Sequence, residues 1–108
     1  METLDPNTKQ KIEDQIKNNR IFLYMKGDRN FPHCGFSARV VEILEQLGVN
    51  YETYDILEDP EMRQSLKIYS NWPTFPQLYV GGQLVGGCDI VTELFESGEL
   101  QKIVGQER

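Results

Sequence analysis

The 108-residue chain has very little histidine and cysteine, with one histidine and two cysteines. One such chain cannot supply the four Cys/His ligands of a usual structural zinc site, nor the four thiolates of an iron–sulfur cluster. Two cysteines also do not make a disulfide scaffold, which a chain of this length does not need in order to fold. An iron–sulfur cluster bound here must therefore take ligands from outside one chain.

A long apolar run and an excess of basic residues are missing as well. No apolar segment approaches the roughly 18 residues that a membrane span requires, and the N-terminus lacks the basic-then-apolar layout of a signal peptide. The formal net charge is −6, whereas nucleic-acid binding normally needs a basic surface. We therefore expect no membrane or nucleic-acid partner, and a location in the cytoplasm, or in an organelle stroma or matrix if a transit peptide has been removed.

The remaining composition is typical of a globular protein, and we expect one domain over residues 1–108. Hydrophobic residues make up 39% of the chain and charged residues 26%. We expect only the last few residues to be loose. Helical and strand patterns alternate along the sequence. The predicted helices cover 6–18, 34–47, 60–69, 89–97 and 100–104, and the predicted strands cover 21–25, 51–56, 77–80 and 83–85.

Local signals set several of these boundaries. Asp5 and Asp59 each precede a proline, which is the pattern of an N-cap followed by proline in the first helical position, and Asp89 can also cap a helix. Gly81-Gly82 indicates a hairpin turn. A strand–helix–strand order predicts a parallel pair with a right-handed crossover. The sequence therefore predicts an α/β fold with a four-stranded mixed sheet and helices on both faces.

Positive charge is concentrated in one segment of this acidic chain. Residues 20–40 sum to +3, and the rest of the chain sums to −9. A local basic segment is typical of a site for an anionic ligand or a thiolate, although random clustering on a solvated surface explains it equally well. The charged residues of the segment are Arg20, Lys26, Asp28, Arg29 and Arg39.

Cys34 lies where a polar loop meets a predicted helix. Free backbone N–H groups and the helix dipole favour a negative charge at that position. Nearby Lys26, Arg29 and Arg39 add positive potential, so we expect a thiol with a lowered pKa. A buried, inert cysteine is the alternative. His33 could suggest a Cys–His pair, but neighbours on an extended loop point apart, so we do not favour it.

The residue at the fourth position of the Cys34 motif is Ser37, where a redox Cys-x-x-Cys motif has its second thiol. A mixed disulfide on Cys34 must then be resolved by an external thiol or by Cys88. Efficient reduction of protein disulfides by a dithiol mechanism is therefore disfavoured.

Three ordered segments resemble the monothiol glutaredoxins of the Cys-Gly-Phe-Ser class. The similarity covers about residues 8–104 and implies a thioredoxin-like fold. Many family members have a proline where this chain has Arg29. The segments are Lys26-Gly27 through Pro32-His33-Cys34-Gly35-Phe36-Ser37, then Trp72-Pro73-Thr74-Phe75-Pro76-Gln77, and finally Gly86-Gly87-Cys88-Asp89.

The resemblance implies a glutathione site with Cys34 as the reactive residue. Lys26 and Arg63 would pair with the glycine carboxylate, and the main chain of Phe75 would bind the cysteinyl part. The γ-glutamyl end would meet the backbone of Cys88 and the side chain of Asp89. The implied site also includes Phe36, a cis peptide bond before Pro76, and Trp72 at its border.

Each of these residues also has an ordinary structural interpretation. Lys26 and Arg63 could be solvated surface charges, and Asp89 could only cap a helix. Trp72 could fill the core. Cys88 could pack as a small apolar residue, ligate iron or form a disulfide with Cys34, and we favour packing.

The resemblance further implies a [2Fe–2S] cluster shared by two subunits. Cys34 of each subunit and one glutathione per subunit would supply its four thiolates. Such a protein would act in iron–sulfur cluster carriage and transfer and in iron and redox homeostasis, with BolA-like proteins and apo iron–sulfur proteins as partners. The alternatives are a glutathione-dependent oxidoreductase, of at most weak activity through Cys34, and a redox sensor based on Cys34–Cys88 pairing.

Overall fold

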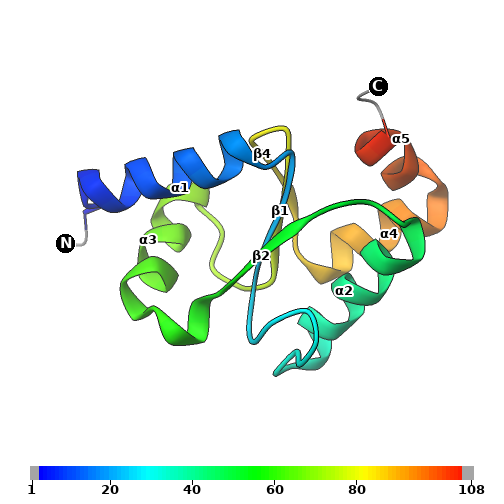
Figure 1. The fold of residues 1–108 in the computed structure, drawn as a ribbon, viewed down its shortest axis with the longest axis horizontal. Coiled ribbons are helices and arrows are strands. Elements are labelled where there is room, and N and C mark those ends of the chain that lie inside the picture. Colours follow the sequence, from blue (N-terminus) through cyan, green and yellow to red (C-terminus); the bar gives the residue numbers. More distant parts are fainter. Residues whose placement is uncertain (1–2, 106–108) are drawn as a thin grey trace.

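A four-stranded mixed sheet forms the centre of the molecule (Figure 1). The computed structural model describes residues 3–105. The strand order is β2-β1-β3-β4; β1 pairs in parallel with β2, and β3 is antiparallel to both β1 and β4. This is the predicted mixed sheet. Its strands are β1 (Ile21–Met25), β2 (Glu52–Asp55), β3 (Gln77–Val80) and β4 (Gln83–Gly86).

Helices cover both faces of the sheet, as predicted (Figure 1). One face carries α1 (Pro6–Asn18) and α3 (Pro60–Ser70), and the other carries α2 (Gly35–Leu47), α4 (Cys88–Ser97) and α5 (Glu99–Gly105). Every residue of β1 is buried. Leu23 packs in the core cluster with α2, α4 and α5, whereas Tyr24 packs with α1 and α3. A strand covered on both faces explains why this segment is apolar throughout.

The predicted helix starts at Asp5 and Asp59 are confirmed. The Asp5 carboxylate accepts a hydrogen bond from the Thr8 amide at 3.0 Å, and Asp59 accepts one from the Met62 amide at 3.1 Å. The expectation that Asp89 caps a helix is wrong. Helix α4 begins one residue earlier, its N-cap is Gly87, and no side chain caps it. The Asp89 carboxylate therefore lies in the first turn and is not used as the cap.

Strand β2 is shorter than the predicted strand over 51–56. Ile56 begins a short 3-10 helix, η1 (Ile56–Glu58), which the sequence pattern did not indicate. The carboxylate of Asp55 accepts hydrogen bonds from the amides of Leu57 and Gly27, each at 2.9 Å. The first of these bonds caps η1 and ends the strand.

Two further expectations concern the C-terminal end of the chain and membrane-spanning helices. The expectation that the last few residues are loose falls partly on residues 106–108, which lie outside the described residues. Among the helices described between residues 3 and 105, none is long and apolar enough to cross a membrane.

Asp59 also joins α3, which carries Arg63, to α1 and β2. The Tyr54 hydroxyl donates to Asp59 at 2.6 Å and accepts from Lys11 Nζ at 2.9 Å, and Lys11 lies 3.7 Å from Asp59. The Tyr54 hydroxyl, the Met62 amide and Lys11 lower the pKa of the Asp59 carboxyl, against a smaller opposing effect of burial. The folded state therefore stabilises the ionised form of Asp59.

We predict that Asp59→Ala lowers the free energy of unfolding by about 1 kcal/mol at neutral pH, because a helix cap is lost. The folded-state pKa of Asp59 is lowered, so its contribution is complete above the unfolded-state pKa and is lost as pH falls through the folded value. Urea denaturation should show the wild-type advantage shrinking in acid. Exposed Glu58→Ala is the control, and an advantage that does not change with pH would contradict the prediction.

Candidate functional site

Cys34 lies at a helix start, as its position in the sequence predicted, and the structure makes it the N-cap of α2. Its backbone is extended, with φ −152° and ψ 156°, and its Sγ accepts a hydrogen bond from the Ser37 amide at 3.4 Å. The side chain is partly exposed. The sulfur therefore occupies the place that a carboxylate oxygen takes at the starts of α1 and α3.

Ser37 not only stands where a redox motif has its second thiol, but also places a hydroxyl beside the Cys34 sulfur. Its side chain is fully buried, its Oγ accepts a hydrogen bond from the Lys26 amide at 3.1 Å, and it lies 3.4 Å from Cys34 Sγ. Because the hydroxyl already accepts from a backbone N–H, its own hydrogen is available to an ionised sulfur. Sequence reasoning missed this role, which depends on the Lys26 amide lying against the first turn of α2.

Hydrogen bonds to the sulfur set the acidity of Cys34. Burial raises the pKa of its thiol, but the Ser37 hydroxyl, the amides of Ser37 and Phe36, and the charge of Lys26 lower it by more in total. The pKa of Cys34 is thus below its ordinary value. A larger thiolate fraction near neutral pH makes the sulfur a better nucleophile and metal ligand.

The predicted group of cations around the thiol is only partly present. Lys26 contributes to the lowered pKa of Cys34. The Arg29 guanidinium instead lies over the ring of Tyr51, and Arg39 pairs with Glu42 at 2.9 Å. The expectation is therefore confirmed for Lys26, whereas the contacts of the two arginines are with Tyr51 and Glu42.

A cavity of about 410 Å³ lies between the start of α2, the loop before β3 and the start of α4. Phe36 is 63% exposed, so its side chain is not part of the core. The cavity brings together four of the residues predicted to bind a ligand, together with Trp72. Its lining residues are Phe36, Trp72, Thr74, Phe75, Gly87, Cys88, Asp89 and Ile90.

The other predicted site residues do not line this cavity. Lys26 directly follows β1, Cys34 precedes Phe36 by two residues, and Arg63 lies on α3. Among the described residues, the buried side-chain nitrogens and oxygens without a hydrogen-bond partner are Arg63 Nε and Trp72 Nε1. Buried donors are normally satisfied, so a water or a ligand is needed to supply the acceptor for each of these two atoms.

Close backbone contact forms one wall of the cavity. A Cβ atom on Gly87 would lie 3.2 Å from the Pro76 carbonyl oxygen and 3.5 Å from Trp72 Nε1. The Phe75–Pro76 peptide bond is cis, as the family resemblance implied. Buried Gln77 donates from Nε2 to the carbonyl oxygens of Trp72 and Thr74, each at 3.2 Å. Glycine at position 87 thus allows the start of α4 to pack against a loop held by Gln77.

Charge at this wall suits a zwitterionic ligand. The N-terminus of α4 has no side-chain cap, so its first amides can meet a carboxylate. The carboxylate of exposed Asp89 is close in sequence to those amides and can meet an ammonium group. Apolar surface from Phe36 and Phe75 completes a cavity whose volume is within the usual range for small-molecule sites.

Comparison with known proteins identifies the family. The glutaredoxin family model matches residues 21–85. A protein of Rickettsia conorii named probable monothiol glutaredoxin 2 is 56% identical over 93 residues, which are 86% of this chain and 87% of that protein. The chain belongs to the monothiol glutaredoxin family. Its sequence resemblance to that family is therefore confirmed.

Solved glutaredoxins share the fold of this chain. The solution structure of a reduced apo glutaredoxin from poplar has a TM-score of 0.82 and 48% identity, and the match covers 91% of this chain and 90% of that one. A buckwheat glutaredoxin in complex with glutathione has a TM-score of 0.83 and 25% identity, and the match covers 93% and 89%. The thioredoxin-like fold implied by the sequence is confirmed.

Cys88 of this glutaredoxin is both a cavity residue and a packing residue. It is the first residue of α4 and packs against the core cluster that contains Leu23, and its Sγ lies 3.9 Å from the Thr92 hydroxyl. This environment agrees with the packing interpretation of Cys88. Cys88 also lines the same cavity as Asp89, so iron ligation and disulfide formation remain hypotheses.

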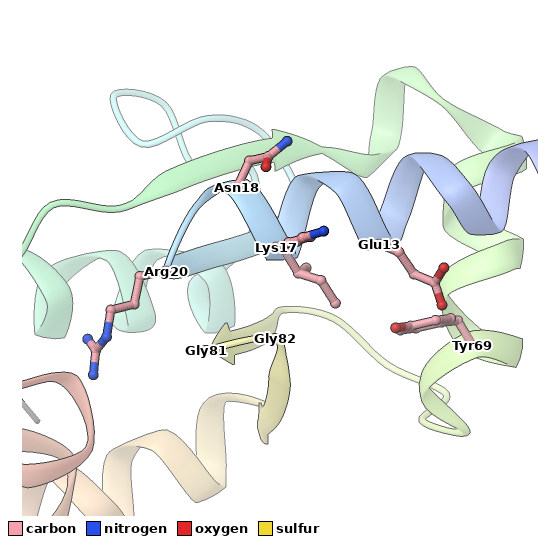
Figure 2. Close-up of a pocket in the computed structure, with 8 residues that line it drawn as sticks. Glu13, Lys17, Asn18, Arg20, Tyr69, Gly81 and Gly82 are labelled. Atoms are coloured by element: carbon pink, nitrogen blue, oxygen red, sulfur yellow. The ribbon is translucent and has the colours of Figure 1, made fainter. Parts of the chain in front are cut away.

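A second cavity, of about 670 Å³, lies elsewhere on this glutaredoxin, between α1, α3 and the turn after β3 (Figure 2). Glu13 and Tyr69 line it on one side, and Gly81 lines it on another. The Gly81 amide donates to the Arg20 carbonyl, just before β1 begins, whereas Cys34 follows the other end of β1. The larger cavity is therefore at the opposite end of the strand from the thiol.

We predict that Ser37→Ala raises the pKa of Cys34, because a hydrogen bond to the thiolate is lost. Hydrogen bonds to charged groups contribute about 1.5–3 kcal/mol, so alkylation at pH 7 should slow roughly tenfold or more. The rate of alkylation by iodoacetamide, measured in Cys88→Ser protein as a function of pH, gives the midpoint. Ser97→Ala, at the end of α4, is the control, and an unchanged midpoint in Ser37→Ala would exclude this role for the hydroxyl.

Proposed function

We propose that this glutaredoxin binds glutathione beside Cys34 and carries a [2Fe–2S] cluster between proteins. The observation that carries the proposal is the partly exposed Cys34 sulfur, with a lowered pKa, at a helix start next to a ligand-sized cavity. A thiolate two residues before Phe36, which lines a cavity of small-molecule size, is placed to act together with a thiol-containing ligand.

The residues present fit glutathione, which supplies a second thiol when it is bound. Asp89 and the free amides of α4 would hold the γ-glutamyl ammonium and carboxylate, and the main chain of Phe75 would hold the cysteinyl part. Lys26 and Arg63 would meet the glycine carboxylate. The unpartnered Nε of Arg63 supports this, because a solvated surface arginine leaves no buried donor unpaired. The buckwheat relative in complex with glutathione supports the same ligand class.

The number of thiolate ligands that one chain can offer supports a cluster shared by two subunits. A [2Fe–2S] cluster needs four thiolate-class ligands. Within residues 3–105, no group of three or more cysteine, histidine, aspartate and glutamate side chains is placed to hold a metal ion. If Cys88 does not ligate iron, two copies of Cys34 and two glutathiones complete the set. Two of the ligands are then small molecules held by modest contacts, which suits transfer of the cluster.

The expected partners follow from this role. A second copy of the chain completes the cluster site, and apo iron–sulfur proteins receive the cargo. BolA-like proteins are proposed as regulatory partners from the family resemblance. We place the protein in the cytoplasm or an organelle stroma or matrix, where thiols remain reduced.

A glutathione-dependent oxidoreductase is the second candidate function, and the lowered pKa of Cys34 favours it. The Cys34 thiolate would attack the glutathione sulfur of a mixed disulfide, forming a disulfide with glutathione and releasing the protein thiolate. A second glutathione thiolate would then attack that disulfide, releasing oxidised glutathione and regenerating Cys34. Ser37 cannot replace the second glutathione, so the activity depends on glutathione concentration.

We predict that the protein reconstituted with iron, sulfide and glutathione gains visible absorption and the mass of two subunits. Cys34→Ser should abolish cluster uptake because a required ligand is removed, whereas Cys88→Ser should retain it. Absorption spectra and native mass spectrometry measure both properties. Wild-type protein that stays monomeric and iron-free would contradict the carrier function, and loss of uptake in both variants would indicate ligation by four protein cysteines.

For the oxidoreductase candidate, we predict that removal of glutathione from a glutathionylated peptide depends on Cys34. Cys34→Ser should lose the enzyme-dependent rate, and Cys88→Ser should keep it if an external thiol resolves the intermediate. A coupled assay of oxidised glutathione gives the rates. Equal rates for wild type and Cys34→Ser would exclude this function.

A further inference from the structure

The loop between β1 and α2 is folded tightly on itself. The His33 amide donates to the Lys26 carbonyl at 2.8 Å, and the Phe31 amide donates to the Asp28 carbonyl at 3.1 Å. A Cβ atom on Gly27 would lie 2.4 Å from the Phe31 carbonyl oxygen. The loop therefore closes over Gly27, and it leads directly into Cys34.

Two contacts attach this loop to the last residue of β2, Asp55, and to Tyr51, the residue just before the strand. Close to β1, the Gly27 amide donates to the Asp55 carboxylate at 2.9 Å. Farther along, the Arg29 guanidinium donates to the Tyr51 carbonyl oxygen and lies 4.2 Å from the centre of the Tyr51 ring. Arg29 thus combines a charge-assisted hydrogen bond with a cation–π contact.

Tyr51 is a rigid attachment point. Its side chain is only 5% exposed and packs in the core cluster between the sheet and α2. Its hydroxyl donates to Glu45 on α2 at 2.6 Å. Arg29 therefore links the loop before Cys34 to the core and, through Tyr51, to the helix that Cys34 caps.

We propose that Arg29 is a positioning residue, which holds the 26–33 loop through Tyr51 so that Lys26 and Cys34 keep their relative placement. The loop includes Lys26, whose amide orients Ser37, and it ends at the residue before Cys34. The hydrogen bond and ring contact of Arg29 with Tyr51 restrict the middle of this loop. The inference rests on the proposed glutathione site where it concerns Lys26.

The test compares Arg29→Ala with wild type by amide hydrogen exchange in the ligand-free protein. This substitution removes the hydrogen bond from Arg29 to the Tyr51 carbonyl oxygen and the contact of Arg29 with the Tyr51 ring. Their loss should increase local opening of the loop about tenfold, measured at the amides of Phe31 and His33. Amides in the middle of α2 and β1 should keep wild-type exchange, because the core does not open with the loop. Arg39→Ala removes the same charge from a partly exposed site on α2 and should leave the loop amides unchanged.

A second measurement tests positioning directly. The reaction of Cys34 with oxidised glutathione should slow severalfold in Arg29→Ala, and Arg29→Lys should recover part of the rate because it keeps a cation over Tyr51. Both reactions use a Cys88→Ser background. A purely structural brace would lower the thermal midpoint and leave this rate unchanged.

The outcomes separate the proposals. Wild-type exchange at Phe31 and His33 in Arg29→Ala, or an equal increase in Arg39→Ala, overturns the role of Arg29. Faster exchange with an unchanged rate toward oxidised glutathione also overturns it, since the loop would then open without affecting the thiol. Failure of wild-type protein to bind glutathione would contradict the proposed function, whereas the exchange experiment needs no ligand.

Discussion

The hydrogen bond from the Ser37 amide to Cys34 Sγ is the contact on which the site depends. Through this bond the sulfur caps the helix. Because the capping group is titratable, the helix start also stabilises its ionised form. Carboxylates cap α1 and α3, where the cap contributes to folding alone, and no side chain caps α4. The helices on one face thus begin with structural caps. On the other face, α2 begins with a reactive sulfur and α4 with amides available to a ligand.

Strand pairing brings the three family motifs to one edge of the sheet. Tyr24, near the end of β1, pairs with Gln77 at the start of β3, and Leu78 pairs with Gly86 at the end of β4. The loop before Cys34, the loop before Gln77 and the start of α4 therefore converge, although they are far apart in the sequence. The cavity beside Cys34 follows from this register, which β1 fixes because it is buried on both faces.

The candidate site could be predicted from the sequence in its chemistry but only partly in its contacts. The position of Cys34 at a helix start and the grouping of Phe75, Cys88 and Asp89 followed from motifs. The partners of Arg29 and Arg39, the exposure of Phe36 and the hydrogen bonds of Ser37 did not. Each of these depends on what lies opposite the side chain, and a sequence pattern along one element does not contain that information.

The sequence by itself determined the order of the α-helices and strands, the caps at Asp5 and Asp59, the position of Cys34 at a helix start, and the missing second thiol at position 37. These features arise from interactions within about four residues, so spacing along the chain is enough to specify them. Only the tertiary structure decided that Asp89 leaves the start of α4 uncapped, that Arg63 keeps an unpaired buried nitrogen, and that Arg29 lies over Tyr51. Contacts between residues far apart in sequence depend on sheet register and packing, which form only when the whole chain has folded.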